Sequence, residues 1–230
     1  MVVSISQVKC FKACRRAYFF NYIEGLEPVE KAEALQIGTK YHEMLEAVNT
    51  GNSLVDFPDC KEKAMALAYA RFIYPQLEKI GIYAVEQEID CGFSARHDLI
   101  GRVDGIMEDG SVLEHKTTSA EITPQYEYNL MWDEQILAYM AGTGARKIYY
   151  TVIRKPTIRQ KKDETDADFF ERMLNWYESD TDSKIKLLII ERTEEEVEQF
   201  MKDLEAICDE MENTHLLYRN TGWCTVWGRR

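Results

Sequence analysis

Three charged side chains lie in a part of the sequence that is otherwise typical of β-strands. Asp104 stands in GRVDGIMEDG, and Glu114 and Lys116 follow in SVLEHKTT. Because side chains alternate between the two faces of a strand, Glu114 and Lys116 share one face. A hairpin that turns at Asp109-Gly110 would bring Asp104 to the same place on the neighbouring strand. Two carboxylates make an oxygen site for Mg²⁺ or Mn²⁺, and a lysine beside them can orient and activate a water.

This set favours hydrolysis of a phosphodiester, but the same spacing also occurs by chance. For these three residues alone, an exposed ladder of charges on a surface hairpin is the simpler interpretation. Further candidates lie on expected helices. His42 offers a nitrogen ligand that favours Mn²⁺, and Gln135 and Tyr139, four residues apart, lie on one helix face. Their alternatives are a structural histidine and ordinary polar packing.

The elements that must position these residues follow from hydrophobic periodicity and turn residues. Ser4 or Ser6 is expected to cap the first helix, and Gly25 to end it. The predicted helices cover residues 4–23, 30–48, 60–79, 125–141, 166–178 and 193–211. The predicted strands cover residues 82–93, 97–108, 111–117, 147–153 and 184–192.

We therefore expect one domain that spans residues 1–230. Residues 1–80 form a mainly helical region, and residues 82–153 form a β-β-β-α-β core that holds the candidate residues. Residues 154–230 supply a basic loop, a helix, a strand, an acidic helix and a C-terminal tail.

The composition is ordinary for a globular domain, with 45% hydrophobic and 30% charged residues. No apolar run approaches the ~18 residues that cross a bilayer. The N-terminus MVVSISQVKCFKACRR lacks the pattern of a secretory signal, which predicts a reducing, cytoplasmic setting with unpaired cysteines.

The formal net charge of −12 argues against a protein that coats nucleic acid through bulk electrostatics. A local basic track is still present, because five positive charges fall into nine residues: Arg154, Lys155, Arg159, Lys161 and Lys162. The alternative for this stretch is a solvated loop.

Four motifs occur in an order that one nuclease family shares: GTKYH (38–42), GRVDGI (101–106), LEHK (113–116) and QILAY (135–139). In this respect the chain resembles, nearly end to end, the RecB-like branch of the PD-(D/E)XK nucleases, which includes phage-type exonucleases and CRISPR-adaptation nucleases. The resemblance implies an α/β fold with a restriction-endonuclease-like core, in which a mixed central β-sheet is flanked by helices, and an N-terminal helical region.

The resemblance also implies a role for each candidate residue. Asp104, Glu114 and His42 would bind the metal, with the backbone carbonyl of His115 completing the site, and Lys116 would assist the attacking water. Gln135 and Tyr139 would reach the phosphate or the lysine from the following helix. The side chain of His115 is disfavoured as a ligand because strand alternation points it into the opposite layer.

The opening CFKACRRAYFFNY resembles the first helix of the family in its Cys-x-Arg-x-Tyr pattern. Arg15 and Arg16 could meet phosphates, and Tyr18 or Tyr22 could stack on bases. The other expected contacts to DNA are Arg154, Lys155 and Arg159. The alternative for the opening stretch is an amphipathic core helix with two exposed arginines.

Some RecB-like nucleases hold a [4Fe–4S] cluster with one N-terminal and three C-terminal cysteines. Cys14 and Cys224 stand at matching ends, but only TVWGRR follows Cys224, so four thiolates in the family spacing are missing. We therefore expect Mg²⁺ or Mn²⁺ as the cofactor and do not expect a cluster.

The leading hypothesis is a metal-dependent deoxyribonuclease, an exonuclease on DNA ends or single strands in recombination, repair or phage DNA processing. A recombinase, a helicase or a single-strand-binding protein could act with it, and the oligomeric state is left open. The rivals are a DNA-binding or assembly subunit that keeps the fold without cleaving, and an interaction module whose motifs match by chance.

Overall fold

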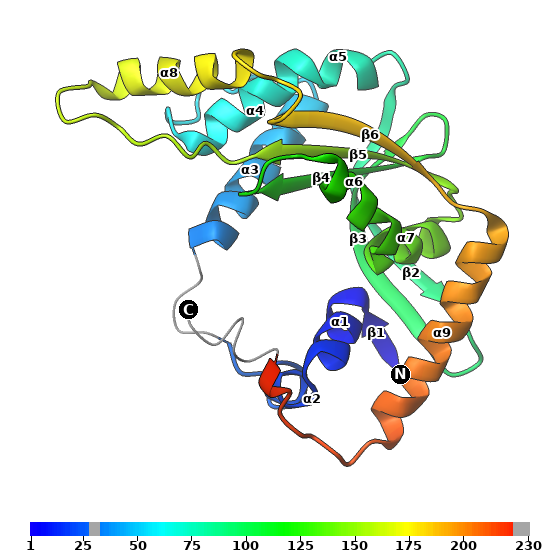
Figure 1. Cartoon of the computed structure of the whole chain (residues 1–230). Helices are drawn as coiled ribbons and strands as arrows, with labels where there is room; N and C mark the ends of the chain where they lie inside the picture. Colours follow the sequence, from blue (N-terminus) through cyan, green and yellow to red (C-terminus); the bar gives the residue numbers. More distant parts are fainter. Residues whose placement is uncertain (28–32, 223–230) are drawn as a thin grey trace.

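A mixed sheet of six strands is the centre of residues 1–27 and 33–222, the part of the chain that this computed structural model describes. Its strand order is β1-β3-β4-β5-β6 (Figure 1). β1 and β4 pair with different parts of one edge of β3, and β2 pairs with the other edge. The strands are β1 (Val2–Ser4), β2 (Ile82–Gly92), β3 (Asp98–Met107), β4 (Val112–Thr118), β5 (Lys147–Arg154) and β6 (Ile185–Glu191). The β1/β3 and β4/β5 pairs are parallel, and the other pairs are antiparallel. The expected α/β fold with a mixed sheet is therefore confirmed.

Helices cover both faces of this sheet. The longer ones are α1 (Ile5–Ala13), α3 (Glu33–Asn49), α4 (Lys61–Phe72), α7 (Glu134–Thr143), α8 (Asp166–Glu178) and α9 (Glu194–Asn213). The short ones are α2 (Arg15–Tyr18), α5 (Tyr74–Leu77), α6 (Pro124–Asn129), the π-helical turn η1 (Phe19–Ile23) and the 3₁₀ turn η2 (Leu130–Trp132). Among the described residues, no helix is long and apolar enough to span a membrane.

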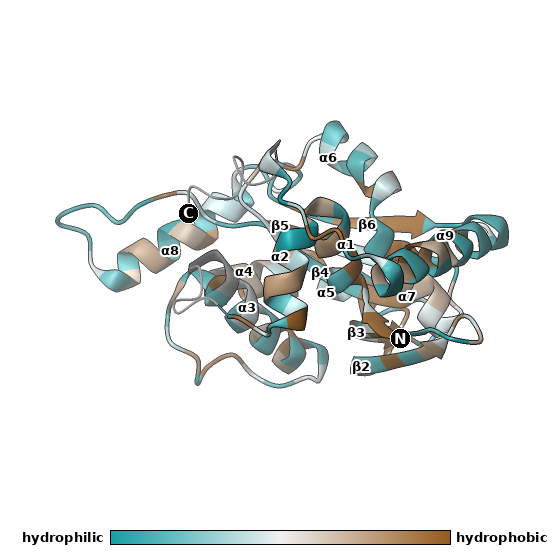
Figure 2. Ribbon diagram, turned by 90° about the horizontal axis from the view of Figure 1, so that it is seen from below, coloured by the Kyte–Doolittle hydropathy of each residue, from teal (hydrophilic) through white to brown (hydrophobic). Residues whose placement is uncertain are grey.

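Two layers of apolar side chains hold the helices to the sheet. On one face, α3, α4, α5 and α8 pack against Leu113 and Tyr149 (Figure 1). On the other face, α7 and the start of α9 pack on Val112 and Ile148. A neighbouring cluster joins Phe11 of α1 to the rest of α9. The acidic helix α9 buries Val197, Phe200, Leu204, Cys208 and Met211, which recur every three or four residues. Figure 2 colours much of the α9 ribbon teal, for hydrophilic residues. This amphipathic pattern determines which side of α9 faces the core.

The hairpin between β3 and β4 turns at the expected place. Gly110 adopts a left-handed φ of +79°, which glycine tolerates without steric cost, and the Met107 N–H donates to the Ser111 carbonyl at 2.8 Å. Asp109 accepts a hydrogen bond from the Ser111 N–H. The capping positions Ser4 and Thr193 are also confirmed, each in a capping box.

The N-terminal region differs from the expected single helix over residues 4–23. Residues 2–4 form an edge strand parallel to β3, and the helix breaks at Cys14, whose φ of −161° is extended. In one continuous helix the rings of Phe11 and Tyr18 would lie about 10 Å apart along the axis. The break instead brings their centroids to 5.4 Å in an edge-to-face contact. The contact between the two rings therefore replaces the hydrogen bonds that a continuous helix would form here.

Two other predicted helices are divided for identifiable reasons. The expected helix over 60–79 ends at Phe72 and resumes at Tyr74, because Pro75 has no N–H for the helical ladder. The expected helix over 125–141 is interrupted at Asp133, which is extended and caps α7 by accepting the Gln135 N–H at 3.0 Å. Gln135 therefore lies in the first turn of α7.

Gly105, directly after Asp104, allows the close approach of β2 and β3. A Cβ at this position would lie 2.9 Å from the backbone oxygen of Ala84, whereas a Cβ on Gly38 of α3 would meet nothing within 4 Å. We expect Gly105→Ala to lower the free energy of unfolding by about 1–3 kcal/mol through overpacking. The control Gly38→Ala should raise it by about 0.5–1 kcal/mol. Urea unfolding of both variants checks this, and equal stability of the two would contradict the tight packing of β2 on β3.

Candidate active site

The candidate residues gather where β3 and β4 separate. These strands pair only through Gly105–Leu113 and Ile106–Val112, while β1 pairs with Asp98–Ile100 farther along the same edge of β3. The carboxylate of Asp104 fills the gap between β3 and β4, and its Oδ2 accepts the backbone N–H of His115 at 2.6 Å. A side chain thus takes the place of a strand-to-strand hydrogen bond, and the other oxygen of Asp104, Oδ1, faces His42.

Helix α3 brings His42 to the same carboxylate. Tyr41, Met44, Leu45 and Val48 of this helix are buried in the core, so the orientation of α3 is fixed by packing. His42 Nδ1 lies 3.1 Å from Asp104 Oδ1, and its side chain is only half-buried. The upstream histidine and the strand carboxylate, 62 residues apart in sequence, are therefore in direct contact.

Glu114 and Lys116 lie on the other side of the gap and form an ion pair with each other. The Glu114 side chain is only 4% exposed, and its Oε2 is buried without a hydrogen-bond partner. Burial removes the hydrogen bonds that water would make to this oxygen, and no protein group replaces them, so the arrangement costs free energy. The donor set of carboxylates and one imidazole fits Mg²⁺ or Mn²⁺, and Glu114 Oε2 is the orphaned atom that such an ion would satisfy.

The charges of the two acids are strongly coupled to their surroundings. Burial alone would raise the pKa of Asp104, but the hydrogen bond with His42, helped by the hydrogen bond from the backbone N–H of His115, outweighs it and lowers the pKa to about 2. Burial, reinforced by the charge of Asp104, raises the pKa of Glu114 to about 8 despite the neighbouring Lys116. The pKa of Lys116 is raised although burial opposes this, because the charge of Glu114 favours the ammonium. The basic side chains of the pocket therefore neutralise its acidic side chains only in part, and a divalent cation would neutralise the remainder.

The side chain of His115 points into the opposite layer, as strand alternation requires. It is buried, with Nδ1 2.6 Å from Thr151 Oγ1 and Nε2 3.1 Å from Asn49 Nδ2. Asn49 in turn accepts the Tyr69 hydroxyl at 2.7 Å. Burial lowers the pKa of His115 to about 4, so the ring is neutral and structural. This network fixes the rotation of β4 and thereby the direction of Glu114 and Lys116.

Gln135 and Tyr139 lie together on α7, on the side of the sheet that carries Glu114. Gln135 Nε2 donates to the Tyr139 hydroxyl at 2.5 Å. Burial, together with the charge of Glu114, raises the pKa of Tyr139 beyond its ordinary value of 10, so the phenol stays protonated. The pair offers neutral hydrogen-bond groups next to the acidic residues.

One acidic residue of this site was not among the sequence candidates. Glu86 of β2 stands opposite Asp104, between the pairs Val85–Gly105 and Gln87–Val103, and its φ is +50°. Ligand atoms of His42, Glu86 and Asp104 lie within 4.8 Å of one another. The sequence signal that could have found Glu86 is a β2–β3 hairpin centred on residue 95, which pairs position 86 with position 104.

The N-terminal candidates for DNA contact are engaged inside the protein to different degrees. Tyr18 is buried and packs on Phe11, so its ring is not available to stack on a base. Arg15 pairs with Glu210 and lies over the ring of Tyr218, 5.1 Å from its centroid. Arg16 is exposed and lies over Phe20, and Tyr22 is 38% exposed. Of the four candidates Arg15, Arg16, Tyr18 and Tyr22, solvent therefore reaches Arg16 and Tyr22 best.

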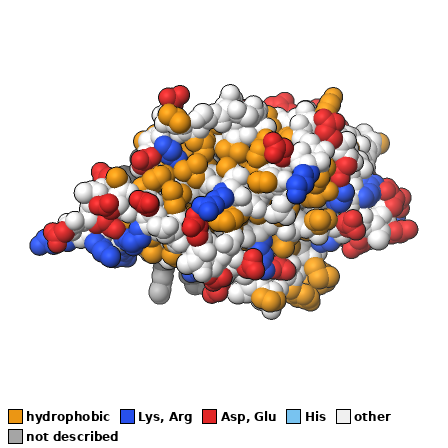
Figure 3. Space-filling model, turned by 90° about the horizontal axis from the view of Figure 1, so that it is seen from above, with side chains coloured by type: hydrophobic (Ala, Val, Ile, Leu, Met, Phe, Trp, Pro, Cys, Tyr) orange, Lys and Arg blue, Asp and Glu red, His pale blue; other side chains and the backbone are white. Residues whose placement is uncertain are grey.

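The basic segment forms a projecting loop between β5 and α8, seen at the left of Figure 1 and carrying several of the basic side chains at the left end of Figure 3. Arg154 is half-buried over the ring of Trp176, and Lys155 donates its N–H to the Thr118 carbonyl. Arg159 is exposed, as are Lys161 and Lys162. The positive charge that solvent reaches most freely is therefore concentrated toward the tip.

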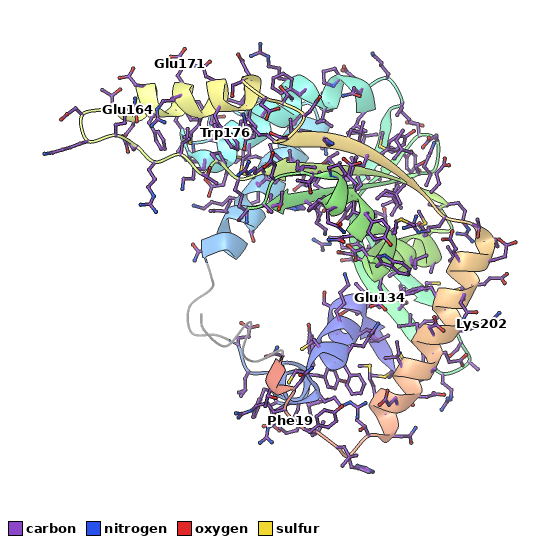
Figure 4. All side chains as sticks on the ribbon, viewed as in Figure 1. Phe19, Glu134, Glu164, Glu171, Trp176 and Lys202 are labelled. Atoms are coloured by element: carbon purple, nitrogen blue, oxygen red, sulfur yellow. The ribbon has the colours of Figure 1, made fainter. Side chains whose placement is uncertain are left out.

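Glu164 anchors this loop to α8. It accepts two hydrogen bonds from Arg172, at 2.6 and 2.7 Å, and the Lys161 N–H at 2.9 Å. Figure 4 shows Glu164 at the projecting end of the molecule and Trp176 near the sheet, so the loop runs along α8 between these two points.

Of the two cysteines that were considered for a cluster and disfavoured, Cys14 is buried at the break between α1 and α2, and its Sγ accepts the Asn220 N–H at 3.4 Å. Cys224 lies outside the described residues. Cys208 is buried in α9, where burial raises the pKa of its thiol to about 11.

Comparisons with known proteins identify the family and agree with the fold. A profile of the PD-(D/E)XK nuclease superfamily matches residues 2–80 and 52–226. No curated protein sequence matches the chain significantly. A candidate exonuclease from Eubacterium rectale superimposes with a TM-score of 0.59 at 13% identity, over 99% of this chain and 87% of that one. The protein SSO0001 gives a TM-score of 0.50 at 16% identity, over 94% and 78% of the two chains. At these identities the solved structures show the fold alone.

Proposed function

The chain belongs to the PD-(D/E)XK nuclease superfamily, and we propose that it is a divalent-metal-dependent deoxyribonuclease that hydrolyses phosphodiester bonds. The observation that carries the proposal is the meeting of Asp104, His42 and the Glu114–Lys116 pair at the point where β3 and β4 separate. An exposed charge ladder would not need a nearly buried glutamate with one unpartnered oxygen. That contrast favours a catalytic site over the surface-hairpin alternative.

In this proposal Asp104, Glu114 and His42 hold the cation, together with the carbonyl of His115. A bound Mg²⁺ or Mn²⁺ supplies charge that lowers the pKa of the attacking water and neutralises the phosphate. Lys116 Nζ is protonated, because its pKa is raised, and it donates hydrogen bonds that orient the water. Gln135 and Tyr139 offer hydrogen bonds to the phosphate without adding charge.

Action on DNA ends is the finer part of the proposal. It is supported by the name of the Eubacterium rectale protein, a candidate exonuclease that aligns over 99% of this chain. By analogy with such proteins we place the activity in recombination, repair or phage DNA processing. A recombinase, a helicase or a single-strand-binding protein would be the natural partner in any of these settings.

The test uses linear and covalently closed circular DNA of one sequence, single-stranded and double-stranded, incubated with Mn²⁺, Mg²⁺ or EDTA. We expect degradation of the linear forms with Mn²⁺ or Mg²⁺, loss of activity in EDTA and survival of the circles. Cleavage in EDTA would overturn the metal-dependent mechanism. Cleavage of the circles would replace the exonuclease by an endonuclease, and binding without cleavage would favour a DNA-binding subunit.

The tip of the basic loop should contribute to DNA binding through phosphate contacts. Replacing Arg159, Lys161 and Lys162 with Gln removes three exposed charges. If all three meet phosphates of a single strand, the slope of log affinity against log salt should fall by about 2. Fluorescence anisotropy of a labelled oligonucleotide in EDTA, at several salt concentrations, measures this slope.

The control for this prediction is a triple variant outside the loop, Arg71→Gln on α4, Lys79→Gln in the turn after α5 and Lys202→Gln on α9, where Figure 4 marks Lys202. It changes the net charge by the same amount, so it reports the effect of charge alone. Equal slopes for the two triple variants would contradict a specific role of the loop.

A further inference from the structure

Glu86 is an acidic residue of the site to which the proposed hydrolysis gives no role. Its side chain is 29% exposed, and its nearest charged partner, Arg102, is 3.4 Å away at the limit of a hydrogen bond. It reaches the site from β2, whereas Glu114 reaches it from β4. Asp104 on β3 therefore has one carboxylate neighbour on each side.

The separation of the ligand atoms suits a single cation. Mg²⁺ or Mn²⁺ binds oxygen at about 2.1 Å, so two ligands on opposite sides of the ion lie about 4.2 Å apart. Atoms of His42, Glu86 and Asp104 all lie within 4.8 Å of one another. Neighbouring ligands of an octahedral ion lie about 3.0 Å apart, so modest side-chain rotations that shorten these separations would bring the three atoms into one coordination sphere.

A second observation at the same place points to a cation. The Glu114 side chain is nearly buried, and its Oε2 has no hydrogen-bond partner. A divalent cation is the kind of group that would satisfy such a carboxylate oxygen. Lys116 pairs with Glu114, whereas Glu86 has Arg102 as its charged partner.

The backbone at Glu86 also has an unusual conformation. Its φ of +50° makes it the only non-glycine residue with positive φ in the described part of the chain. Such a conformation costs a non-glycine residue about 1–3 kcal/mol and persists where the surroundings impose it. Here it occurs in the middle of a strand, at the position directly opposite Asp104.

We propose that Glu86 is a metal ligand, which completes a His42–Glu86–Asp104 set on the β2 side of Asp104. The inference rests on the divalent cation of the proposed function, and it adds a ligand from a strand that the sequence motifs do not include. Glu86 then holds the cation from the side away from Lys116, so the water that Lys116 orients and the Glu86 carboxylate lie on different sides of the ion.

Neighbouring residues supply matched controls. Glu88 lies two positions along the same strand, pairs with the same Arg102 at 3.2 Å and is 77% exposed. Glu88→Gln therefore changes the charge of β2 and the Arg102 pairing without touching the ligand set. Arg102→Gln removes the ion pair while it keeps Glu86. A role of Glu86 that acts only through Arg102 would be reproduced by Arg102→Gln.

The experiment is titration of the metal-free protein with Mn²⁺. Binding is measured by calorimetry and by the loss of the electron paramagnetic resonance signal of free Mn²⁺. We expect Glu86→Gln to weaken Mn²⁺ binding about 10–100-fold. Glu88→Gln and Arg102→Gln should stay within about threefold of the wild type. Circular dichroism confirms that each variant is folded, and Glu86→Asp, which restores a carboxylate, should recover part of the affinity.

Unchanged Mn²⁺ affinity in folded Glu86→Gln would overturn the inference, as would an equal loss in Arg102→Gln. These outcomes are separate from failure of the nuclease proposal. Mn²⁺ binding that depends on Glu86 in a protein that cleaves no DNA would support the ligand and refute the nuclease. Mn²⁺-dependent cleavage with affinity independent of Glu86 would do the reverse.

Discussion

Replacing Lys116 with Met should reduce metal-dependent DNA cleavage by about 10³-fold, in the range expected when a group that activates a nucleophile is lost. The affinity for Mn²⁺ should stay within a few-fold of the wild type, because Lys116 contacts Glu114 rather than the cation in the proposed site. Methionine keeps the length of the side chain and removes only its charge and its hydrogen bonds. Single-turnover cleavage of a labelled oligonucleotide at saturating Mn²⁺ measures the chemical step directly.

The matched control is Lys147→Met on β5, where Lys147 pairs with Asp109 at the β3–β4 turn. It removes an equivalent charge from the same sheet without touching the site, so its cleavage rate should equal that of the wild type. Full activity of Lys116→Met would reject the proposed role of the lysine. A parallel loss of Mn²⁺ affinity would instead show that the Glu114–Lys116 pair organises the metal ligands.

The part of this site that lies within a few residues of the chain could be predicted from the sequence. Strand alternation separates Glu114 and Lys116 from His115, and the turn at Asp109-Gly110 sets Asp104 beside them. These are local effects of the peptide backbone. Because a hairpin has few degrees of freedom, one turn motif is enough to place its two strands.

The remaining features depend on contacts between distant segments. β3 and β4 separate after two residue pairs because the carboxylate of Asp104 takes the hydrogen bond that continued pairing would use. Sequence periodicity does not indicate this separation. It also misses the break at Cys14, where the packing of Phe11 on Tyr18 decides the course of the chain. Glu86 was missed for the same reason, since its place depends on how β2 pairs with β3.

Replacing Glu114 with Gln should have opposite effects on activity and on stability. We expect a loss of metal-dependent cleavage of about 10³-fold, because an amide is a poor ligand for a divalent cation that needs negative charge. In EDTA, however, the variant should unfold at a temperature a few degrees higher than the wild type, a gain of about 1–3 kcal/mol. The nearly buried carboxylate with its unpartnered Oε2 is destabilising until a cation binds.

The stability difference in EDTA should also depend on pH. The pKa of Glu114 is raised from 4.5 to about 8, so the folded protein keeps a proton that the unfolded chain loses in this range. The wild type should therefore lose stability as the pH rises from about 5 to 8, and Glu114→Gln should lack this loss. The gap in melting temperature should widen across that interval. Scanning calorimetry at pH 5, 6.5 and 8 measures it.

Two comparisons separate this trade-off from a general effect of removing charge. Glu164→Gln replaces a glutamate whose oxygens accept hydrogen bonds from Arg172 and Lys161, so its melting temperature should fall or stay unchanged. Adding Mn²⁺ should reverse the order of the wild type and Glu114→Gln, because an ion that binds only the folded wild type stabilises it by mass action. A lower melting temperature of Glu114→Gln in EDTA at pH 7 would instead identify the Glu114–Lys116 pair as a structural ion pair, since the fold would then need that carboxylate without any metal.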